Sequence, residues 1–500
     1  MRRILTILLL LCSLGTMALV PPRDLSRWDE WQAMREARRV NRAPAAQQAV
    51  GQRVIIPRIL LITVSFSDFP FTTPQADVDS MFNGLNWNKD GATGSLRQYY
   101  CDQSNGAYNP RFDVVGPVTL SKGYADYGAG NDSRANISNM VCEACSLVDD
   151  SVDFSLYDSN NDGFVDLVYI YYAGFGANDK ASTYAKSLIP TWNDLVWPAY
   201  WSVSTTASPR YFDGKYISAC EYSNELDAYY TTATKTVPAG IGTACHEFGH
   251  ALGLPDLYTT DDNAIHKVLG DWDVMCYGLY NNDTHTPPSL SAYERFYMGW
   301  LTPTLITEPD TLTLEYIGAS NQAYLISEND THNMDGLRPD TAVFYMLENR
   351  LRTGWDIGIP GNGLLLTRIS FSLAKWMGNT VNNDANAMGV DLIEADGLAP
   401  VYNSKNTNNG YFGKPGDLFP TGATSYHGIP DHDITEITMS DGVIRFAYRG
   451  GLPPDTDTVH TPDVLPVVEM KRAYKTVRNG QLLIHSGGHT YSIYGIKQDN

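Results

Sequence analysis

The sequence is short of positive charge. Its 500 residues carry 36 Lys and Arg against 56 Asp and Glu, a formal net charge of -20. Such a surface repels nucleic acid and anionic membranes, so neither is expected as a partner, whereas calcium is a natural one. Internal repeats and low-complexity tracts are also missing. The hydrophobic and charged fractions, 43% and 18%, are those of a folded globular protein with a sizeable core.

A hydrophobic run long enough to cross a bilayer is missing too. The best candidate, residues 4–12, is about half the length that a transmembrane helix needs. Arg2 and Arg3 precede it and small residues follow around Gly15 and Ala18, which is the layout of a secretory signal peptide. A membrane anchor is the alternative, and the short run counts against it. We expect residues 1–18 to be a signal peptide and the protein to be secreted or at the cell surface, without a transmembrane anchor.

Cysteine is scarce. Of seven, Cys12 leaves with the predicted signal peptide, and the even number that remains fits disulfide bonds outside the cytoplasm. Cys142 and Cys145 form a CxxC pair with no second pair beside it, so a local disulfide or two buried thiols is expected there rather than a metal site. Cys101 and Cys276 are assigned no disulfide partner.

Helical and strand patterns mix in the first part of the chain. Residues 19–54 are rich in Arg, Ala and Gln with little β character, and predict a helical or loosely ordered pro-segment. Residues 55–66 and 167–172 are apolar, β-branched runs typical of buried strands, whereas 94–101 and 137–148 have the apolar spacing of helices. We therefore expect an α+β catalytic domain over residues 55–302.

The second part is mostly β. Short apolar segments at 311–317, 341–347, 363–370 and 442–448 alternate with Gly, Asn, Asp and Pro turns, which predicts a β-rich domain over 303–450. Prolines in residues 451–472 predict an extended linker. Residues 473–500 have the strand-turn pattern of a small β hairpin with too little core to be a domain alone.

Two histidines four residues apart mark a candidate metal site. In HEFGHALGLPD, His246 and His250 would lie on one helix face where both imidazoles can reach one zinc ion, with Glu247 placed beside a water on the metal. Gly253 tolerates a left-handed turn and is expected to end the helix. That turn would bring in Asp256 as third zinc ligand. The fourth position stays open, as in catalytic zinc sites.

Chance explains this motif poorly. With ten His in 500 residues, HExxH should arise in roughly one such chain in a hundred, and the Gly and Asp spacings lower that by about two orders of magnitude. The alternatives are a core helix with two hydrogen-bonded histidines, and an Asp256 that caps a turn beside Pro255. In the functional interpretation zinc activates water, and Glu247 takes its proton as general base and passes it to the leaving amine.

At these residues the sequence resembles the immune inhibitor A family of secreted bacterial metallopeptidases, whose HEFGHxLGLPDLY and WDVM signatures are met at 246–258 and 272–275. The resemblance implies a metzincin-like catalytic domain, protein or peptide substrates, and synthesis as a zymogen. The pro-segment contains no cysteine, which excludes latency by a cysteine switch; Asp24 or Asp29 could block the zinc instead. Residues 473–500 resemble the sorting domains of type IX secretion substrates, with an ordinary terminal hairpin as the alternative.

In such metallopeptidases a methionine turn lies beneath the zinc, and residues 272–278, WDVMCYG, fit it. Met275 would then be the apolar floor of the site, although a Met followed by aromatic residues is usually core packing. Tyr277 could turn its hydroxyl toward the zinc and stabilise the oxyanion; a buried structural tyrosine is the alternative.

A second candidate metal site lies in residues 158–166. Asp158, Asn160, Asp162 and Asp166 stand at positions 1, 3, 5 and 9 of an EF-hand-like loop, and Phe164 at position 7 would offer its carbonyl. Position 12 is Tyr169 rather than Glu, so a true EF-hand is excluded. We predict a structural calcium here, with a solvated turn as the alternative.

A disulfide between Cys220 and Cys245 would tie the start of the zinc helix to the preceding strand. Taken together, these patterns predict a secreted zinc-dependent endopeptidase with possible secretion machinery as a further partner of its C-terminus. One alternative from another class is a catalytically silent surface or adhesive protein with structural metals, and another is a zinc amidase or ester hydrolase on the same scaffold. Glu247 and the open zinc position favour the peptidase.

Overall fold

An apolar run at residues 59–62 lies within the main sheet, because β2 (Arg58–Ser65) is covered on both faces and needs no polar alternation. β2 pairs in parallel with both of its neighbours, and a fourth parallel strand follows on one side. Beyond it, one strand pairs antiparallel with this fourth strand, and a last, short strand pairs antiparallel with that one. In the described residues the spatial order is β1 (Ala18–Leu19), β6 (Ala199–Ser202), β9 (Ala219–Leu226), β5 (Val168–Phe175), β2 and β3 (Arg111–Thr119).

This computed structural model describes residues 18–24, 27, 31, 53–128, 133–189, 194–260, 268–398, 412–451, 474–478, 481–486, 489–492 and 497–498. Contacts divide the chain into two compact units, Met1–Gly451 and Leu452–Asn500. The predicted signal peptide up to residue 17, most of the pro-segment including Asp29, and the linker from residue 452 lie outside the described residues. Within the described part, no helix is both long and apolar enough to cross a membrane.

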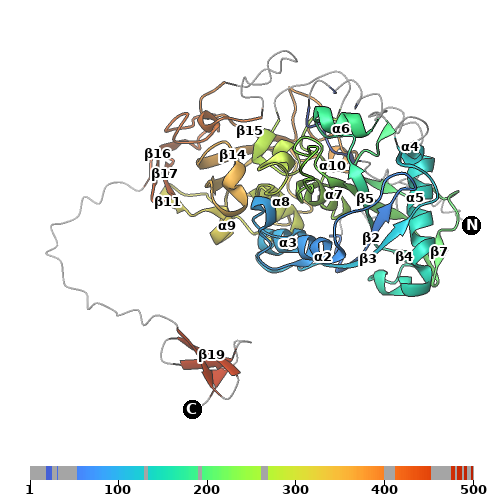
Figure 1. Ribbon diagram of the computed structural model, residues 1–500. Helices are drawn as coiled ribbons and strands as arrows, with labels where there is room; N and C mark the ends of the chain where they lie inside the picture. The colour runs from blue at the N-terminus through green and yellow to red at the C-terminus, as the bar shows by residue number, and fades with distance from the viewer. Residues whose placement is uncertain are drawn as a thin grey trace, which may run out of the picture. The chain divides into compact units, whose positions relative to one another are not determined.

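Helices cover both faces of the main sheet (Figure 1). Those at the predicted positions are α3 (Leu96–Gln103), which Ser95 caps by accepting from Gln98 N, and α5 (Ser133–Val148). The helix of the candidate metal motif is α7 (Gly242–Ala251), and it packs on β9, β6 and β1. The other helices are α2 (Gln75–Asn83), α4 (Tyr124–Tyr127), α6 (Thr183–Leu188), α8 (Ala292–Met298), α9 (Ile317–Ser320) and α10 (Leu373–Met377).

α5 and α7 pack on opposite faces of β9, since successive strand residues point to opposite sides. Glu221 interacts with Cys245 of α7, whereas its neighbour Cys220 interacts with Cys142 and Cys145 of α5. The predicted disulfide between Cys220 and Cys245 is therefore not formed: the sheet separates the two thiols. All six cysteines among the described residues are free.

The β-rich part forms two further sheets, and the predicted strands at 311–317, 341–347, 363–370 and 442–448 agree with observed ones. The first sheet has the order β10 (Thr304–Leu305), β12 (Tyr324–Ser327), β13 (Phe344–Arg350), β14 (Gly363–Ile369), β15 (Val390–Leu392). The second has the order β11 (Asp310–Leu314), β17 (Val443–Tyr448), β16 (Ile434–Ser440). A small ribbon of β4 (Phe164–Val165), β8 (Lys215–Ile217) and β7 (Tyr211–Phe212) lies in the first half of the chain.

One apolar core joins these two sheets, and another continues into the first half of the chain. β13 serves both, because its side chains alternate: Tyr345 and Leu347 belong to the core of the β-rich part, whereas Phe344 and Met346 belong to the large core that includes α7. The β-rich part is thus packed into the same compact unit as the metal motif, and a domain boundary near residue 302 stays a prediction.

The C-terminal unit contains more strands than predicted. Instead of a two-stranded hairpin, its described residues form an antiparallel sheet in the order β18 (Tyr474–Arg478), β19 (Gln481–Ser486), β20 (His489–Ser492) and β21 (Lys497–Gln498). The addition has a physical reason, because a lone hairpin is at best marginally stable in water and further strands are needed to hold it.

Candidate active site

α7 ends in a turn that directs the chain back toward its own histidines. Gly253 has φ 100°, the left-handed conformation expected for it. Its N–H donates to His250 O at 3.0 Å, and the N–H of Leu254 donates to Gly249 O at 2.9 Å. The carbonyl of Leu254 then accepts from the His250 ring at Nδ1, 2.7 Å away. The turn therefore fixes one imidazole and leads directly to Asp256.

The structure brings His246, His250 and Asp256 together. The two Nε2 atoms are 3.1 Å apart, and Asp256 Oδ1 lies 3.2 Å from the first and 3.1 Å from the second. All three residues are fully buried. Ligands at about 2.0–2.1 Å from a tetrahedral zinc would be roughly 3.3 Å from one another, so this triangle has the size of three of the four corners of a tetrahedral zinc site.

The hydrogen bonds around the histidines define which nitrogen faces the centre. His246 Nδ1 lies 2.7 Å from Val274 O, and His250 Nδ1 is held by the Leu254 carbonyl. A carbonyl only accepts, so each Nδ1 carries the proton and each neutral ring directs the Nε2 lone pair inward. Two lone pairs and a carboxylate oxygen that converge in a buried site repel one another without a cation between them. The donor set therefore fits zinc.

The charges in this triangle respond to burial and to one another. Burial opposes ionisation of Asp256, but His250 and His246 hold its pKa well below the usual range. Burial lowers the pKa of His246; for His250 the same effect is outweighed by Asp256, so its pKa is raised. A divalent cation at this point would favour the carboxylate and the neutral rings, which are the ligand forms.

Glu247 lies between the two histidines and is fully buried. One oxygen, Oε2, accepts a hydrogen bond from Tyr200 N of β6 at 2.5 Å, and the N–H of Val20 also donates to the carboxylate. The other, Oε1, has no hydrogen-bond partner in the described part of the chain. Burial raises the pKa of Glu247 to about 8. One oxygen is thus fixed and the other is left for proton transfer.

A loop of the β-rich part clasps the turn that carries Asp256, which sequence reasoning missed. Asn379 receives the N–H of Asp256 on Oδ1 at 2.6 Å and donates from Nδ2 to Asp256 Oδ2. Trp376 Nε1 donates to Gly253 O at 3.1 Å, and the Thr260 N–H donates to Asn383 Oδ1 at 2.7 Å. No local motif signals this contact, because the paired residues are 123 positions apart.

Met275 lies directly under the motif helix. A Cβ built on Gly249 would meet Met275 Sδ at 2.6 Å, so only glycine allows the approach. Asp273 shapes the turn by accepting from Met275 N at 2.7 Å, and the Leu257 N–H donates to Met275 O at 2.8 Å. Met275 thus packs against the motif helix, and its role as the apolar floor of the site stays a prediction.

Tyr277 is buried beside this turn, where its ring lies 4.8 Å from that of Phe412 and 6.2 Å from that of Tyr258. The Tyr258 ring in turn stacks on His246 at 6.1 Å. This packing places Tyr277 one aromatic ring away from a candidate ligand, and an oxyanion role remains a proposal.

The chain's own N-terminal segment lies across the same region. β1 extends the sheet beyond β6, with Ala18 opposite Tyr200 and Leu19 opposite Ala199. Val20 follows, with its N–H on Glu247 and its carbonyl accepting from Trp197 Nε1 at 2.9 Å. Little β character was expected here. The segment is extended because an open sheet edge supplies its hydrogen bonds, which its own sequence does not reveal.

The loop of residues 158–166 satisfies its carboxylates internally. Backbone N–H groups donate to them at 3.0–3.1 Å: Asp162 and Gly163 to Asp158, Phe164 to Asp162, and Ser159 to Asp166. Asn160 donates to Asp162 Oδ2 at 3.0 Å. Lys215 Nζ lies 2.5 Å from Asp158 Oδ2 and supplies a positive charge. These contacts do not support calcium, whose binding stays a prediction.

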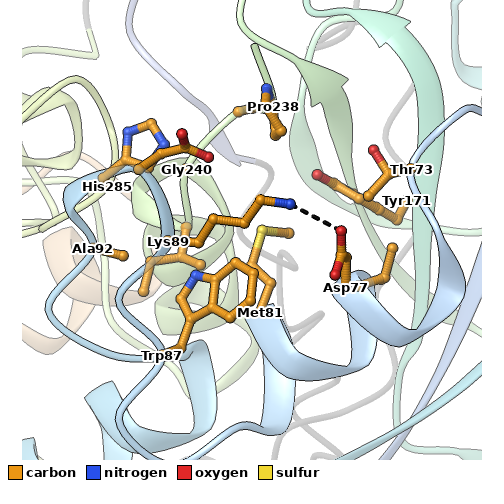
Figure 2. Close-up of a pocket in the computed structure, with 14 residues that line it drawn as sticks. Thr73, Asp77, Met81, Trp87, Lys89, Ala92, Tyr171, Pro238, Gly240 and His285 are labelled. Carbon is orange, nitrogen blue, oxygen red and sulfur yellow. Dashed lines mark hydrogen bonds and ion pairs between the residues drawn. The ribbon is translucent and has the colours of Figure 1, made fainter. Parts of the chain in front are cut away.

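Figure 2 shows a pocket separate from the motif, lined by α2 and by the loop before α7. The ion pair of Lys89 with Asp77, 2.8 Å long, lies in it, flanked by Trp87 and Met81. Its lining includes none of the metal-motif residues. Among described residues, His246, His250 and Asp256 form the one group of three with the donor spacing of a metal site.

A buried His-His-Asp donor set with a glutamate beside it on the same helix is typical of metal-dependent hydrolases. Residues 77–300 match the family model described as the catalytic domain of immune inhibitor A peptidase M6. That range contains the whole motif and the methionine turn, whereas Asn379 lies outside it.

Curated relatives agree with this match. The chain is 27% identical over 303 residues to immune inhibitor A of Bacillus thuringiensis subsp. alesti, which covers 51% of this chain and 42% of the relative. It is 23% identical over 267 residues to the pre-pro-metalloprotease PrtV of Vibrio cholerae serotype O1 (strain M66-2), covering 45% of this chain and 27% of the relative. The chain thus spans less than half the length of either. These similarities support a metalloendopeptidase.

Proposed function

We propose that the protein is a secreted zinc-dependent endopeptidase whose N-terminal segment keeps it latent. The observation that carries the proposal is the convergence of His246, His250 and Asp256 around one point, with Glu247 beside it. The alternative of two satisfied core histidines does not account for two inward Nε2 lone pairs next to a buried carboxylate oxygen.

In this mechanism His246, His250 and Asp256 hold zinc, which when bound lowers the pKa of water and polarises the scissile carbonyl. Glu247 Oε1 accepts the proton of the attacking water, since Oε2 is engaged by Tyr200 N. The same carboxyl then donates that proton to the leaving amine. Burial, which raises the pKa of Glu247, suits a group that must both accept and release a proton. Tyr277 is the candidate hydroxyl for the developing oxyanion.

Latency follows from the position of residues 19 and 20, the first two of the pro-segment. They occupy the β6 edge and donate to Glu247, so a substrate strand cannot reach either until the segment leaves. Asp24 need not bind the metal for this block to work. The name of one relative, a pre-pro-metalloprotease, describes a precursor of the same kind. Removal of residues 19–54 is the activating step in this proposal.

Export and sorting complete the proposal. A signal peptide over residues 1–18 would direct the chain out of the cytoplasm, and the C-terminal sheet at 474–498 would act as the sorting element for secretion. Deleting residues 473–500 is expected to leave the protein in the producing cell, detected by immunoblot of medium and cell fractions; unchanged release would remove the sorting role.

The central experiment measures casein hydrolysis by processed wild type, Glu247→Ala and Glu315→Ala, with bound zinc quantified in each. Glu315 is exposed and serves as a matched control. We expect chelator-sensitive cleavage by wild type and Glu315→Ala, none by zinc-loaded Glu247→Ala, and slow cleavage by unprocessed wild type. If zinc-loaded, processed wild type cleaves neither casein nor a broad peptide library, a silent adhesive protein or another hydrolase replaces the peptidase.

A further inference from the structure

Several backbone groups of the N-terminal segment are hydrogen-bonded to the rest of the chain. Besides the bonds of Val20, the carbonyl of Pro21 accepts from Tyr280 OH at 2.5 Å, and the N–H of Arg23 donates to Asn178 O at 2.9 Å. Any extended peptide carries the same backbone groups, so these contacts do not select a sequence. They show how a substrate strand could lie on β6.

One side chain of the segment, Arg23, is bound by carboxylates, whereas Arg27 donates to the backbone oxygens of Ala177 and Asp179 and lies over Trp197. Arg23 Nη1 lies 2.9 Å from Asp179 Oδ1 and 2.9 Å from Asp227 Oδ2, and its Nη2 lies 3.4 Å from Asp283 Oδ1. The guanidinium also lies over three aromatic rings, those of Tyr229, Tyr230 and Tyr280, at 5.7–5.8 Å from their centroids. Both polar and aromatic partners therefore recognise a planar cation. We call these six residues the Arg23 pocket.

The pocket is built independently of Arg23. Backbone N–H groups of Tyr229 and Tyr230 donate to Asp227 Oδ1 at 2.8 Å, and the Ala228 N–H donates to Asp179 Oδ2 at 2.7 Å. Asp179 and Asp227 are buried, at 5% and 1% exposure. When the N-terminal segment leaves, two carboxylates that backbone N–H groups hold in place lose their cation, which favours binding of another.

We propose that the Arg23 pocket is a substrate subsite for an arginine side chain, which the chain's own Arg23 fills before processing. This inference rests on the proposed endopeptidase function and adds its substrate class. Arginine fits better than lysine, because two of its nitrogens reach three carboxylates, whereas a lysine offers a single nitrogen. A substrate that runs in the direction of β1 would carry this arginine on the C-terminal side of the cleaved bond, since Arg23 follows Val20.

The first test compares the cleavage of two peptides that differ at one position on the C-terminal side of the cleaved bond, where one carries arginine and the other citrulline. Citrulline has nearly the same shape without the charge. We expect processed wild type to prefer arginine by about 10- to 100-fold in kcat/KM. Asp227→Asn should bring this ratio close to one, whereas Asp330→Asn, at an ion pair with Arg449 in the β-rich part, should keep the wild-type ratio. An unchanged ratio in Asp227→Asn overturns the proposal.

The second test needs no catalysis. The peptide of residues 19–24, Leu-Val-Pro-Pro-Arg-Asp, and its citrulline analogue are titrated against Glu247→Ala protein from which trypsin has removed the N-terminal segment, with the new N-terminus sequenced. Glu247 lies outside the pocket, so its loss should affect both peptides alike.

If the arginine peptide binds at least about tenfold more tightly than the citrulline peptide, the pocket is supported. This holds even if casein is not cleaved and the peptidase proposal is wrong. Equal binding of the two peptides overturns the pocket, whether or not the enzyme is active. The two proposals can therefore fail separately.

Discussion

Two short polar segments of the sequence predict metal sites, and their ligand atoms are arranged in opposite ways in the structure. At the motif helix, hydrogen bonds occupy the outer atoms of the ligands, the two Nδ1 nitrogens and Asp256 Oδ2, and leave Nε2, Nε2 and Oδ1 directed at one point. In the loop of residues 158–166, backbone N–H groups and Lys215 use the oxygens themselves. Ligand residues at the right spacing are therefore insufficient; the free atoms must also converge.

The largest difference between the two segments should appear in activity. Glu247→Ala is expected to lower kcat by about 10²- to 10⁴-fold, because it removes the proton acceptor at the converging site. Asp162→Ala in the other loop should change kcat less than about threefold. Both are measured on the processed protein with a fluorogenic peptide, after zinc content has been matched. Comparable losses in the two variants would mean that the loop belongs to the catalytic machinery.

Metal removal should separate the segments next. A zinc-selective chelator is expected to lower the melting temperature by several degrees, since zinc at a thousand times its Kd stabilises by about 4 kcal/mol. Calcium added to the metal-free protein should shift it by less than about one degree. Differential scanning fluorimetry of the same sample with the chelator and with added calcium gives both values. A clear rise with added calcium, absent in Asp162→Ala, would restore calcium to the loop.

The clasp on Asp256 offers a finer test of convergence. Asn379→Ala is expected to weaken zinc binding by about 10- to 100-fold, the usual effect of losing a group that orients a ligand. Asn383→Ala, in the same loop but bonded to Thr260, should have a smaller effect. Competition against a chromophoric zinc chelator measures both affinities. Equal affinities of Asn379→Ala and wild type would show that Asp256 is oriented without its partner.

The smallest effect is expected at Asp158. Burial opposes its ionisation, but Lys215 and the N–H groups of Gly163 and Asp162 lower its pKa from 3.8. The contribution of the ionised Asp158 to the stability of the folded protein is therefore fully present above pH 3.8 and is lost as the pH falls through the lowered pKa. Asp158→Asn should cost about 1 kcal/mol at pH 7 and less below about pH 4, measured by urea unfolding at each pH. A cost that does not change with pH would assign it to packing.

The metal motif could be predicted because its geometry is local. Helical spacing alone places His246 and His250 on one face, and Gly253 makes the turn that returns Asp256. The central strands were equally readable, since burial on both faces leaves a continuous apolar run such as that of β2.

What could not be predicted depends on which surfaces meet. Cys220 lies in β9 and Cys245 in the next helix, α7. Only the fold shows that α7 covers the face of β9 to which Glu221 points, and not the face to which Cys220 points. β1 was missed because its hydrogen bonds come from the β6 edge. Asn379 was missed for the same reason, since a partner 123 residues away leaves no periodic pattern.

The clasp also bears on what the smallest working enzyme can be. The loop of residues 376–383 grips the ligand turn at Gly253, Asp256 and Thr260, and Met346 and Trp376 belong to the same apolar core as the motif helix. A fragment that stops at residue 302 would keep every residue of the motif and lose the residues that hold Asp256 in place. Residues 55–451 should therefore be kept together when this enzyme is shortened for biotechnology or when its parts are recombined with those of relatives.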